Sequence, residues 1–334
     1  MTASVSSGEW RVVGHSMAIR LLQRAVINNS LSHAYLFIGP SQVGKQTLAL
    51  ELARTINCSS DSRPCGACRS CQLVSQNKHP DIVTIRGEGA HDAILVDQIR
   101  TLRREASLLP VEGRRRVYIL CDMQLANENA ANALLKTLEE PPSHVTLLLT
   151  AISEELVPPT VVSRCQVIYL RPQPRNLIRQ ALEERWRLPA ARADLLARLS
   201  GGRMGRALDL MQSEQLWTRR QEALNQLRGI LTAHWGERFL VAAELARRPE
   251  QIAGILETWL SWWHDVLLIQ QGLSTRIMNV DHQDELEATQ SAFAPAGVRH
   301  AIASLQECAD HLEKNVNPRL ALERLMLHLP KVAA

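Results

Sequence analysis

Four cysteines crowd into one short segment of the chain. Cys58, Cys65, Cys68 and Cys71 lie close together in the sequence, with a proline and a glycine between them. Four thiolates at such spacing can enclose a zinc ion in a tetrahedral site, which leaves no open position for catalysis. An iron–sulfur cluster is one alternative, although the Cys-Pro that follows such motifs is missing, and free cysteines are the other. The spacing therefore predicts a structural zinc site.

A loop between two glycines has the spacing that binds phosphates. The run Gly39-Pro-Ser-Gln-Val-Gly44-Lys45 matches a P-loop, in which backbone N–H groups cradle phosphates at a helix N-terminus and the lysine neutralises their charge. The next residue should be Ser or Thr, whose hydroxyl holds Mg²⁺, but it is Gln46, with Thr47 displaced by one position. An ordinary glycine turn before a helix is the alternative. The pattern predicts P-loop ancestry with an impaired metal site.

A P-loop hydrolase also needs two neighbouring carboxylates at the end of a second strand. One of them holds the metal and the other orients the attacking water. The run Val117-Tyr-Ile-Leu-Cys-Asp122 supplies the first carboxylate, whereas the second position is Met123. Because a thioether cannot accept a proton from water, we expect very slow hydrolysis even if nucleotide binds. Alternatively, Asp122 is only a helix N-cap or a turn residue.

Short apolar runs predict the strands that position these residues. Residues 34–38 form a buried-strand pattern, followed by the glycine loop and by a helical pattern over about 44–56. Residues 116–122 and 145–150 are β-rich and are followed by polar residues, as further buried strands are. Strands that alternate with helices predict an α/β domain over residues 1–171, with a parallel sheet and helices on both of its faces.

Beyond Pro172 the strand patterns stop and long helical stretches follow. We predict a helical lid over residues 172–214 and an all-α domain over residues 215–334. Within the all-α domain, apolar residues at helical spacing predict amphipathic helices at 222–230, 241–246, 252–271 and 296–329.

Composition and charge narrow the class of protein. At 334 residues and 46% hydrophobic content, the chain can form more than one core, and its net charge of +4 is too small to require nucleic acid. No apolar run is long enough to span a bilayer, and residues 1–8 lack the charged and apolar regions of a secretory signal. The seven cysteines, four of them clustered, suit metal ligation in a reducing cell. We therefore expect a soluble, cytoplasmic protein.

One long stretch carries a family resemblance. It consists of Asn-Glu-Asn-Ala-Ala-Asn-Ala-Leu-Leu-Lys-Thr-Leu-Glu-Glu-Pro-Pro at 127–142, the strand pattern at 145–150 and Ser-Arg-Cys at 163–165. This combination closely resembles the AAA+ clamp-loader subunits of bacterial DNA replication. Further matches lie at 12–15, 32–37 and 315–323. The resemblance covers nearly the whole chain and implies an AAA+ domain, a helical lid and a C-terminal helical collar that joins subunits in a five-membered ring.

Within that family, the resemblance points to a subunit without motor function. The motor subunits gamma and tau carry an intact P-loop, an Asp-Glu pair and a sensor arginine in the lid. In this chain the lid motif Gly-Arg-Met-Gly-Arg-Ala-Leu puts Gly205 at the sensor position. Together with Gln46 and Met123, three positions of the nucleotide site are therefore altered. Arg203 and Arg206 adjoin the sensor position, so nucleotide binding stays open. The pattern is similar to that of delta-prime subunits, which retain the fold but not the motor.

The resemblance also assigns roles to individual residues. Arg164 of Ser-Arg-Cys would be an arginine finger for the ATP site of a neighbouring gamma or tau subunit, because a guanidinium is a rigid, permanently charged fork. The alternative is a surface arginine paired with Glu154 or Glu155. The four cysteines match a small zinc module inserted after the P-loop helix. The degenerate nucleotide site would comprise Gly39, Gly44, Lys45, Thr47, Asp122 and Thr150.

The implied function is to assist assembly and ring loading. Such a subunit holds gamma or tau and delta in a hetero-pentamer and helps to place the sliding clamp on primed DNA, as an accessory part of a DNA-directed DNA polymerase. One rival is an active clamp-loader ATPase, in which Thr47 or Gln46 holds Mg²⁺ and Glu128 orients water. A second rival is a zinc-dependent DNA-binding module.

Two further patterns have two interpretations each. Arginines at 100, 103, 104 and 114–116 could face DNA phosphates or the partner ring, but a solvated helix face near Glu105 and Glu112 is favoured. Trp259, Trp262 and Trp263 suit a core by default, whereas the family resemblance suggests a collar interface.

Overall fold

The computed structural model describes residues 9–88, 93–314 and 316–331 of the chain. Residues 1–8, for which we predicted that no secretory signal is present, lie outside the described residues. So does Asn315, the first residue of the motif at 315–323. The chain forms two compact units: the first runs to Ala190 and includes Gly202–Arg206, and the second comprises Ala191–Gly201 and the chain from Ala207 onward. The stretch 172–214, predicted as a lid, contributes to both units.

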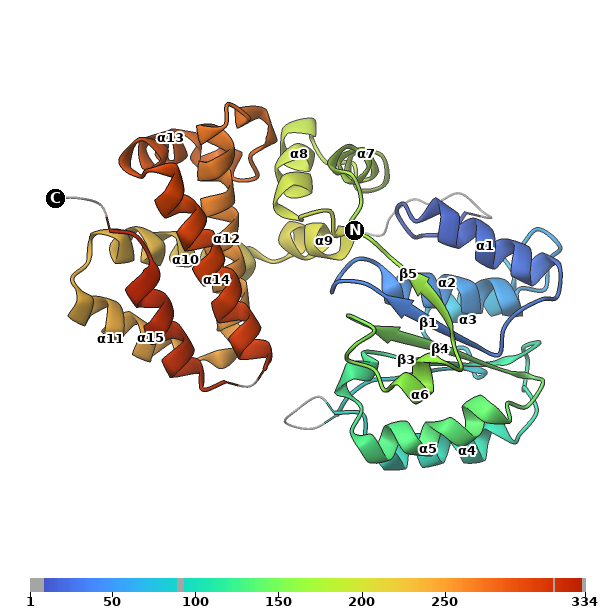
Figure 1. Cartoon of the computed structure of the whole chain (residues 1–334). Helices are drawn as coiled ribbons and strands as arrows, with labels where there is room; N and C mark the ends of the chain where they lie inside the picture. Colours follow the sequence, from blue (N-terminus) through green and yellow to red (C-terminus); the bar gives the residue numbers. More distant parts are fainter. Residues whose placement is uncertain (1–8, 89–92, 315, 332–334) are drawn as a thin grey trace. The chain divides into compact units, whose positions relative to one another are not determined.

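The first unit is built on a parallel sheet. Its five strands are ordered β2-β3-β4-β1-β5 (Figure 1), and every pairing is parallel. The strands are β1 (Ala34–Ile38), β2 (Ile82–Ile85), β3 (Arg116–Leu120), β4 (Val145–Ala151) and β5 (Gln166–Tyr169). The sequence predicted β1, β3 and β4, which lie in the middle of the sheet. It missed the edge strands β2 and β5 because each has only four residues and is largely half-buried or exposed, so its apolar pattern is weak.

Helices cover both faces of this sheet, as the sequence predicted (Figure 1). They are α1 (Ser16–Ile27), α2 (Lys45–Asn57), α3 (Arg69–Ser75), α4 (Val96–Ala106), α5 (Glu128–Glu139) and α6 (Pro159–Val162). Side chains alternate along a strand, so Leu36 and Ile38 of β1 pack with α4 and α5, whereas Tyr35 and Phe37 pack with α1 and α2. Two apolar cores therefore hold the sheet between two helical layers.

Helices make up the rest of the chain. They are α7 (Arg175–Trp186), α8 (Ala190–Leu199), α9 (Met204–Gln212), α10 (Glu214–Thr232), α11 (Trp235–Leu245), α12 (Pro249–Gln270), α13 (Gln283–Ala292), α14 (Pro295–Glu313) and α15 (Pro318–His328). The helical pattern at 296–329 is divided between α14 and α15, because Pro318 begins a new helix. The sequence missed α13, in which Leu286 is the one buried residue among those described. In the described part of the chain, no helix is both long and apolar enough to cross a membrane, the 22-residue α12 included.

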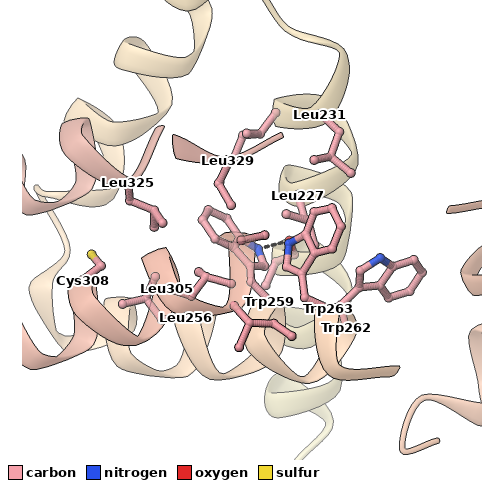
Figure 2. Close-up of a cluster of buried hydrophobic side chains, with 14 of the residues drawn as sticks. Leu227, Leu231, Leu256, Trp259, Trp262, Trp263, Leu305, Cys308, Leu325 and Leu329 are labelled. Atoms are coloured by element: carbon pink, nitrogen blue, oxygen red, sulfur yellow. Dashed lines mark hydrogen bonds between the residues drawn. The ribbon is translucent and has the colours of Figure 1, made fainter. Parts of the chain in front are cut away.

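The three tryptophans of α12 lie inside the second unit. Trp259 and Trp263 are fully buried and Trp262 is 2% exposed, among leucines of α10, α12, α14 and α15 (Figure 2). The Trp259 indole N–H donates to the backbone oxygen of Ala223 at 2.7 Å, so its polar group is satisfied inside the core. The core interpretation of these side chains is confirmed.

Replacing Trp259 with alanine should strongly destabilise the second unit. Loss of a buried tryptophan costs about 3–5 kcal/mol through lost burial and a cavity. Urea unfolding followed by far-ultraviolet circular dichroism would measure this loss. The matched control is Trp235→Ala, since that ring is 51% exposed and stacks on the Arg238 guanidinium, a contact worth about 1 kcal/mol. Equal effects of the two changes would contradict the core assignment.

Candidate functional site

The predicted phosphate loop joins β1 to α2. Gly39 and Gly44 have φ angles of 157° and 111°, and a Cβ on Gly39 would come within 2.2 Å of the Leu170 backbone oxygen, so only glycine fits there. Lys45 is buried, and its ammonium donates to the backbone oxygens of Gly39 at 2.6 Å and Pro40 at 3.0 Å. Burial lowers the pKa of Lys45, and the Asp122 carboxylate partly opposes this. The strand, loop and helix thus have the arrangement of a P-loop.

Asp122 and Thr150 lie at the same edge of the sheet. Asp122 follows β3 with a φ of 59°, and its backbone N–H donates to the buried Thr150 hydroxyl on β4 at 2.9 Å. Asp122 precedes a 3₁₀ turn, Met123–Leu125, but its side chain makes no capping bond there. Because carboxyl ends of parallel strands meet at one edge, Asp122, which is bonded to Thr150, lies near enough to Lys45 for its charge to act on the ammonium. The structure therefore brings three of the predicted site residues together.

The two positions that depart from a motor site have other partners. The Gln46 amide oxygen accepts a hydrogen bond from the Arg86 guanidinium at 3.0 Å. Met123 is 1% exposed and packs in the core between the sheet and helices α4 and α5. Thr47 is exposed on α2. An amide bound to an arginine and a buried thioether thus stand where a hydrolase has a metal hydroxyl and a water-orienting acid.

The sensor position is closed by backbone packing. The N–H of Gly205, in the first turn of α9, donates to the backbone oxygen of Gln42 in the phosphate loop at 2.9 Å. A Cβ on Gly205 would come within 2.8 Å of that oxygen. This close approach admits glycine and excludes an arginine in the same backbone position. The neighbouring Arg203 and Arg206 are half-buried and have partners of their own.

Arg164 lies just beyond α6 with its side chain 35% exposed. Its guanidinium forms an ion pair with the Glu139 carboxylate on α5 at 2.7 Å and donates to the backbone oxygen of Thr160 at 2.9 Å. The alternative, a surface arginine in an ion pair, is right in kind, but its partner is Glu139 and not the predicted Glu154 or Glu155. No sequence pattern pointed to Glu139, which is 25 positions away and meets Arg164 only through the packing of α5 against α6.

The four clustered cysteines converge. The Sγ atoms of Cys58, Cys65, Cys68 and Cys71 all lie within 4.8 Å of one another, and those of Cys58 and Cys68 are 3.9 Å apart. A tetrahedral site with Zn–S bonds of about 2.3 Å needs sulfurs about 3.8 Å apart. Cys58 follows α2 directly, and Cys71 lies in α3. The donor set therefore has the geometry to hold a metal ion.

Backbone N–H groups support the charge of these sulfurs. Those of Cys65, Cys68 and Cys71 donate to the Sγ atoms of Cys58, Cys65 and Cys68 at 3.4, 3.3 and 3.5 Å. Burial alone would raise the pKa of Cys68, but N–H donors lower it to about 6, and such donors also lower the pKa of Cys65. Burial raises the pKa of Cys58 and of Cys71. Cys65 and Cys68 are therefore disposed to be thiolates, whereas Cys58 and Cys71 would lose their protons only to a bound cation.

A buried carboxylate anchors the region beside the cysteines. Asp81, 1% exposed, accepts hydrogen bonds from the backbone N–H groups of Val111, Glu112 and Gly113 at 2.7–2.8 Å. Glu112 in turn pairs with Arg69 of α3 at 2.9 Å. Nothing in the sequence pattern singled out Asp81, because its partners are backbone groups about thirty residues downstream.

The predicted basic stretch does not form a single surface. Arg100 pairs with Asp97 on the exposed face of α4, and Arg104 is exposed beside it. Arg115 instead contacts Thr146, and Arg116 donates to the backbone oxygen at 105. Arg115 and Arg116 therefore bind to β4 and to the end of α4, and not to one shared surface with Arg100 and Arg104.

The chain has clear relatives among known proteins. A family model described as DNA polymerase III, delta subunit, matches residues 14–174, and a model of its C-terminal region matches residues 214–331. DNA polymerase III subunit delta' of Bacillus subtilis is 29% identical over 93% of this chain and 94% of its own length. The chain belongs to the delta-prime family of DNA polymerase III subunits.

Other proteins are similar to parts of the chain. Subunit delta' of Pseudomonas aeruginosa is 40% identical over 40% of this chain and 42% of its own. Subunit tau of Salmonella typhimurium is 30% identical over 81% of this chain but only 46% of its own, so the delta-prime chain spans about half of tau. A gamma subunit-related protein of Thermotoga maritima aligns over 93% of this chain and 98% of its own with 16% identity and a TM-score of 0.41, too low to carry an argument. The α/β unit followed by helices is the AAA+ architecture that the sequence predicted.

Asp81 should make stability depend on pH. Burial raises its pKa, but the three N–H bonds outweigh this and lower it below the ordinary 3.8. Because the pKa of Asp81 is lower in the folded than in the unfolded chain, its carboxylate stabilises the fold at every pH above the unfolded-state pKa. This stabilisation is lost as the pH falls through the folded-state pKa. Asp81→Asn should cost about 1–3 kcal/mol near neutral pH and shrink that acid dependence. Urea unfolding between pH 3 and pH 7 would test it.

The control for this prediction is Asp97→Asn, since that carboxylate is 83% exposed in its pair with Arg100. We expect it to change the unfolding free energy little, as surface pairs do. An Asp81→Asn variant with an unaltered acid dependence would refute the anchoring role.

Proposed function

We propose that this chain is a non-motor stator subunit of a bacterial DNA polymerase III clamp loader, which assists the ATP-driven loading of a sliding clamp onto primed DNA. Membership of the delta-prime family supports the replication role. The observation that carries the stator role is the burial of Met123, where a hydrolase needs a solvated carboxylate.

The rest of the degenerate site supports the same proposal. Gln46 is engaged by Arg86, so no hydroxyl occupies the magnesium position. Gly205 lies against the loop, so the sensor cation has no place there. Three chemically separate contributions to phosphoryl transfer, namely metal binding, water activation and charge stabilisation, are each weakened. ATP can at most remain bound, without appreciable turnover.

Arg164 would act on a neighbouring subunit. Its side chain reaches solvent, and Glu139 and Thr160 use only part of its five N–H donors. A permanently charged guanidinium held by an ion pair at the end of a short helix is suited to meet a phosphoryl group presented by gamma or tau. Such arginine fingers contribute roughly 10³ to 10⁵ in rate. To reach a neighbouring subunit, the guanidinium would leave Glu139 and the Thr160 backbone oxygen, which hold it against α5 and α6.

The collar surface would lie on α11 and α15, which pack against each other. With the α12 tryptophans buried, the apolar side chains that remain exposed on these two helices are suited to meet other subunits. They are Trp235, Leu240, Leu320 and Leu327, each at least half exposed. This surface would contact gamma or tau and delta in a hetero-pentamer.

The cysteine cluster would hold a structural zinc ion. The sulfur separations and N–H donors favour a closed tetrahedral site without a free position. Zinc would thereby fix the turn between α2 and α3. Through the ion pair of Arg69 with Glu112, it would also stabilise the loop that Asp81 anchors.

Arg164→Ala should reduce ATP hydrolysis by the complex, whereas the isolated chain should hydrolyse no ATP with or without this substitution. The experiment reconstitutes the chain with gamma or tau and delta, and measures steady-state hydrolysis with clamp and primed DNA. We expect the site served by Arg164 to lose about 10³-fold or more of its rate, so total hydrolysis falls to a plateau set by the other sites. The kcat should fall more than the KM rises.

The matched control is Arg179→Ala, an exposed arginine in an ion pair on α7. It should leave hydrolysis unchanged. Hydrolysis by the isolated chain would support the active-motor rival, with Thr47 or Glu128 in catalytic roles. Tight DNA binding by the isolated chain, with no affinity for gamma or delta, would support the DNA-binding rival.

Zinc content should depend on Cys68. We expect one zinc ion per purified chain, because four thiolates complete a tetrahedral shell, and its loss in Cys68→Ser. Atomic absorption measures the metal directly. Cys308→Ser, buried in the second unit far along the sequence, should retain it. Iron with visible absorbance, or no metal in the native chain, would overturn the zinc assignment.

A further inference from the structure

Both terminal nitrogens of the Arg164 guanidinium are bound within the first unit. One of them forms the ion pair with the Glu139 carboxylate at 2.7 Å. The other donates to the Thr160 backbone oxygen at 2.9 Å and to the Ser163 hydroxyl at 3.3 Å. A neighbouring subunit can therefore receive this guanidinium only if the guanidinium leaves these acceptors.

The carboxylate that holds the guanidinium lies at the negative end of a helix dipole. Glu139 is the last residue of α5, and Glu140 follows it, so two acidic residues stand where the backbone dipole already concentrates negative charge. Lys136 is the basic residue of that last turn, and the buried Leu138 fixes this end of α5 in the core. The local potential therefore attracts a further cation, which Arg164 supplies.

The backbone that carries Arg164 is fixed as well. Its N–H donates to the Val161 backbone oxygen at 3.1 Å, and Val161 is fully buried in α6, which packs against α5. The side chain is nevertheless 35% exposed. Transfer of the guanidinium from one anion to another therefore requires only rotation about side-chain bonds.

We propose that Glu139 is a resting site for Arg164, from which the guanidinium passes to the terminal phosphate of ATP on a neighbouring subunit and to which it returns once that phosphate has left. This inference rests on the proposed arginine-finger role. Carboxylate and phosphate oxygens match the same guanidinium fork, so the two anions compete for it. A terminal phosphate carries more charge than one carboxylate, whereas a neighbour with ADP has no phosphate at that position. Glu139 thereby restricts the finger to ATP-bound neighbours.

The strength of the resting contact suits a reversible exchange. The exposed fractions of the side chains are 35% for Arg164 and 49% for Glu139, so water screens the pair and its contribution is small. A fully buried pair would be costly to separate, because it would leave an uncompensated charge in the protein interior. The exposed pair instead lowers the availability of the guanidinium by a small factor that a phosphate can overcome.

The resting contact is tested on the full isolated chain with phenylglyoxal, a reagent that adds across the two terminal nitrogens of an arginine. Glu139→Gln should speed the modification of Arg164 roughly 2- to 5-fold, the weight of an exposed ion pair, as measured by mass spectrometry of its peptide. The matched control is Glu307→Gln, because Glu307 forms a pair of the same 2.7 Å length with Arg324 in the second unit. It should speed the modification of Arg324 and leave that of Arg164 unchanged. An unchanged rate at Arg164 in Glu139→Gln would overturn the resting contact.

The exchange itself is tested in the complex reconstituted with gamma or tau, delta, clamp and primed DNA. The part of ATP hydrolysis that depends on Arg164 is the difference between the native complex and the Arg164→Ala complex. The kcat/KM of this part should rise roughly 2- to 5-fold with Glu139→Gln, because the guanidinium no longer has to leave a carboxylate. In the Arg164→Ala background, Glu139→Gln should have no effect on hydrolysis.

The outcomes separate this inference from the proposed function. If Arg164→Ala lowers hydrolysis but Glu139→Gln leaves kcat/KM unchanged or lowers it, the resting-site role is wrong and the arginine finger stands. A lowered kcat would then mean that Glu139 supports the finger during the reaction. If Arg164→Ala leaves hydrolysis unchanged, the finger itself is wrong, and the transfer of the guanidinium to a neighbour is wrong with it.

Discussion

The parallel pairing of β1 with its neighbours β4 and β5 is the constraint on which the first unit depends. Because all strands run the same way, their carboxyl ends and the loops that follow them meet at one edge. This edge collects the phosphate loop after β1, Asp122 after β3, Thr150 at the end of β4 and Arg86 after β2. The apolar cores on both faces keep the sheet rigid, so these groups hold fixed positions whatever chemistry they support.

The altered positions at this edge have each acquired a structural partner. Met123 fills the core beneath α4 and α5, Gly205 permits the first turn of α9 to lie against the phosphate loop, and Gln46 receives the Arg86 guanidinium. A buried thioether stabilises the fold where a carboxylate would have to remain solvated. The fold of a nucleotide-binding module is thus compatible with a site whose altered residues serve packing and hydrogen bonds within the protein.

The cysteine segment illustrates how a local motif is attached to a domain. Its four sulfurs come from a short loop and the first turns of α3, but the segment is fixed through Arg69, Glu112 and the buried carboxylate of Asp81. A charged acceptor with three backbone donors satisfies groups that a loop would otherwise leave to water. The second unit shows the converse, since the Arg238 guanidinium donates to the backbone oxygens of Met326 and Leu329 at the end of α15.

The sequence alone determined the central strands, the phosphate loop, the cysteine cluster and the altered positions Gln46 and Met123, because each rests on local spacing and residue type. Gly205 was assigned only through the family resemblance. It missed β2, β5 and α13, whose burial is partial, and it gave α14 and α15 as one stretch. Only the tertiary structure decided that the α12 tryptophans are core, that Arg164 pairs with Glu139 and that Arg86 reaches Gln46. These facts depend on contacts between residues distant in sequence, which packing creates and no local pattern encodes.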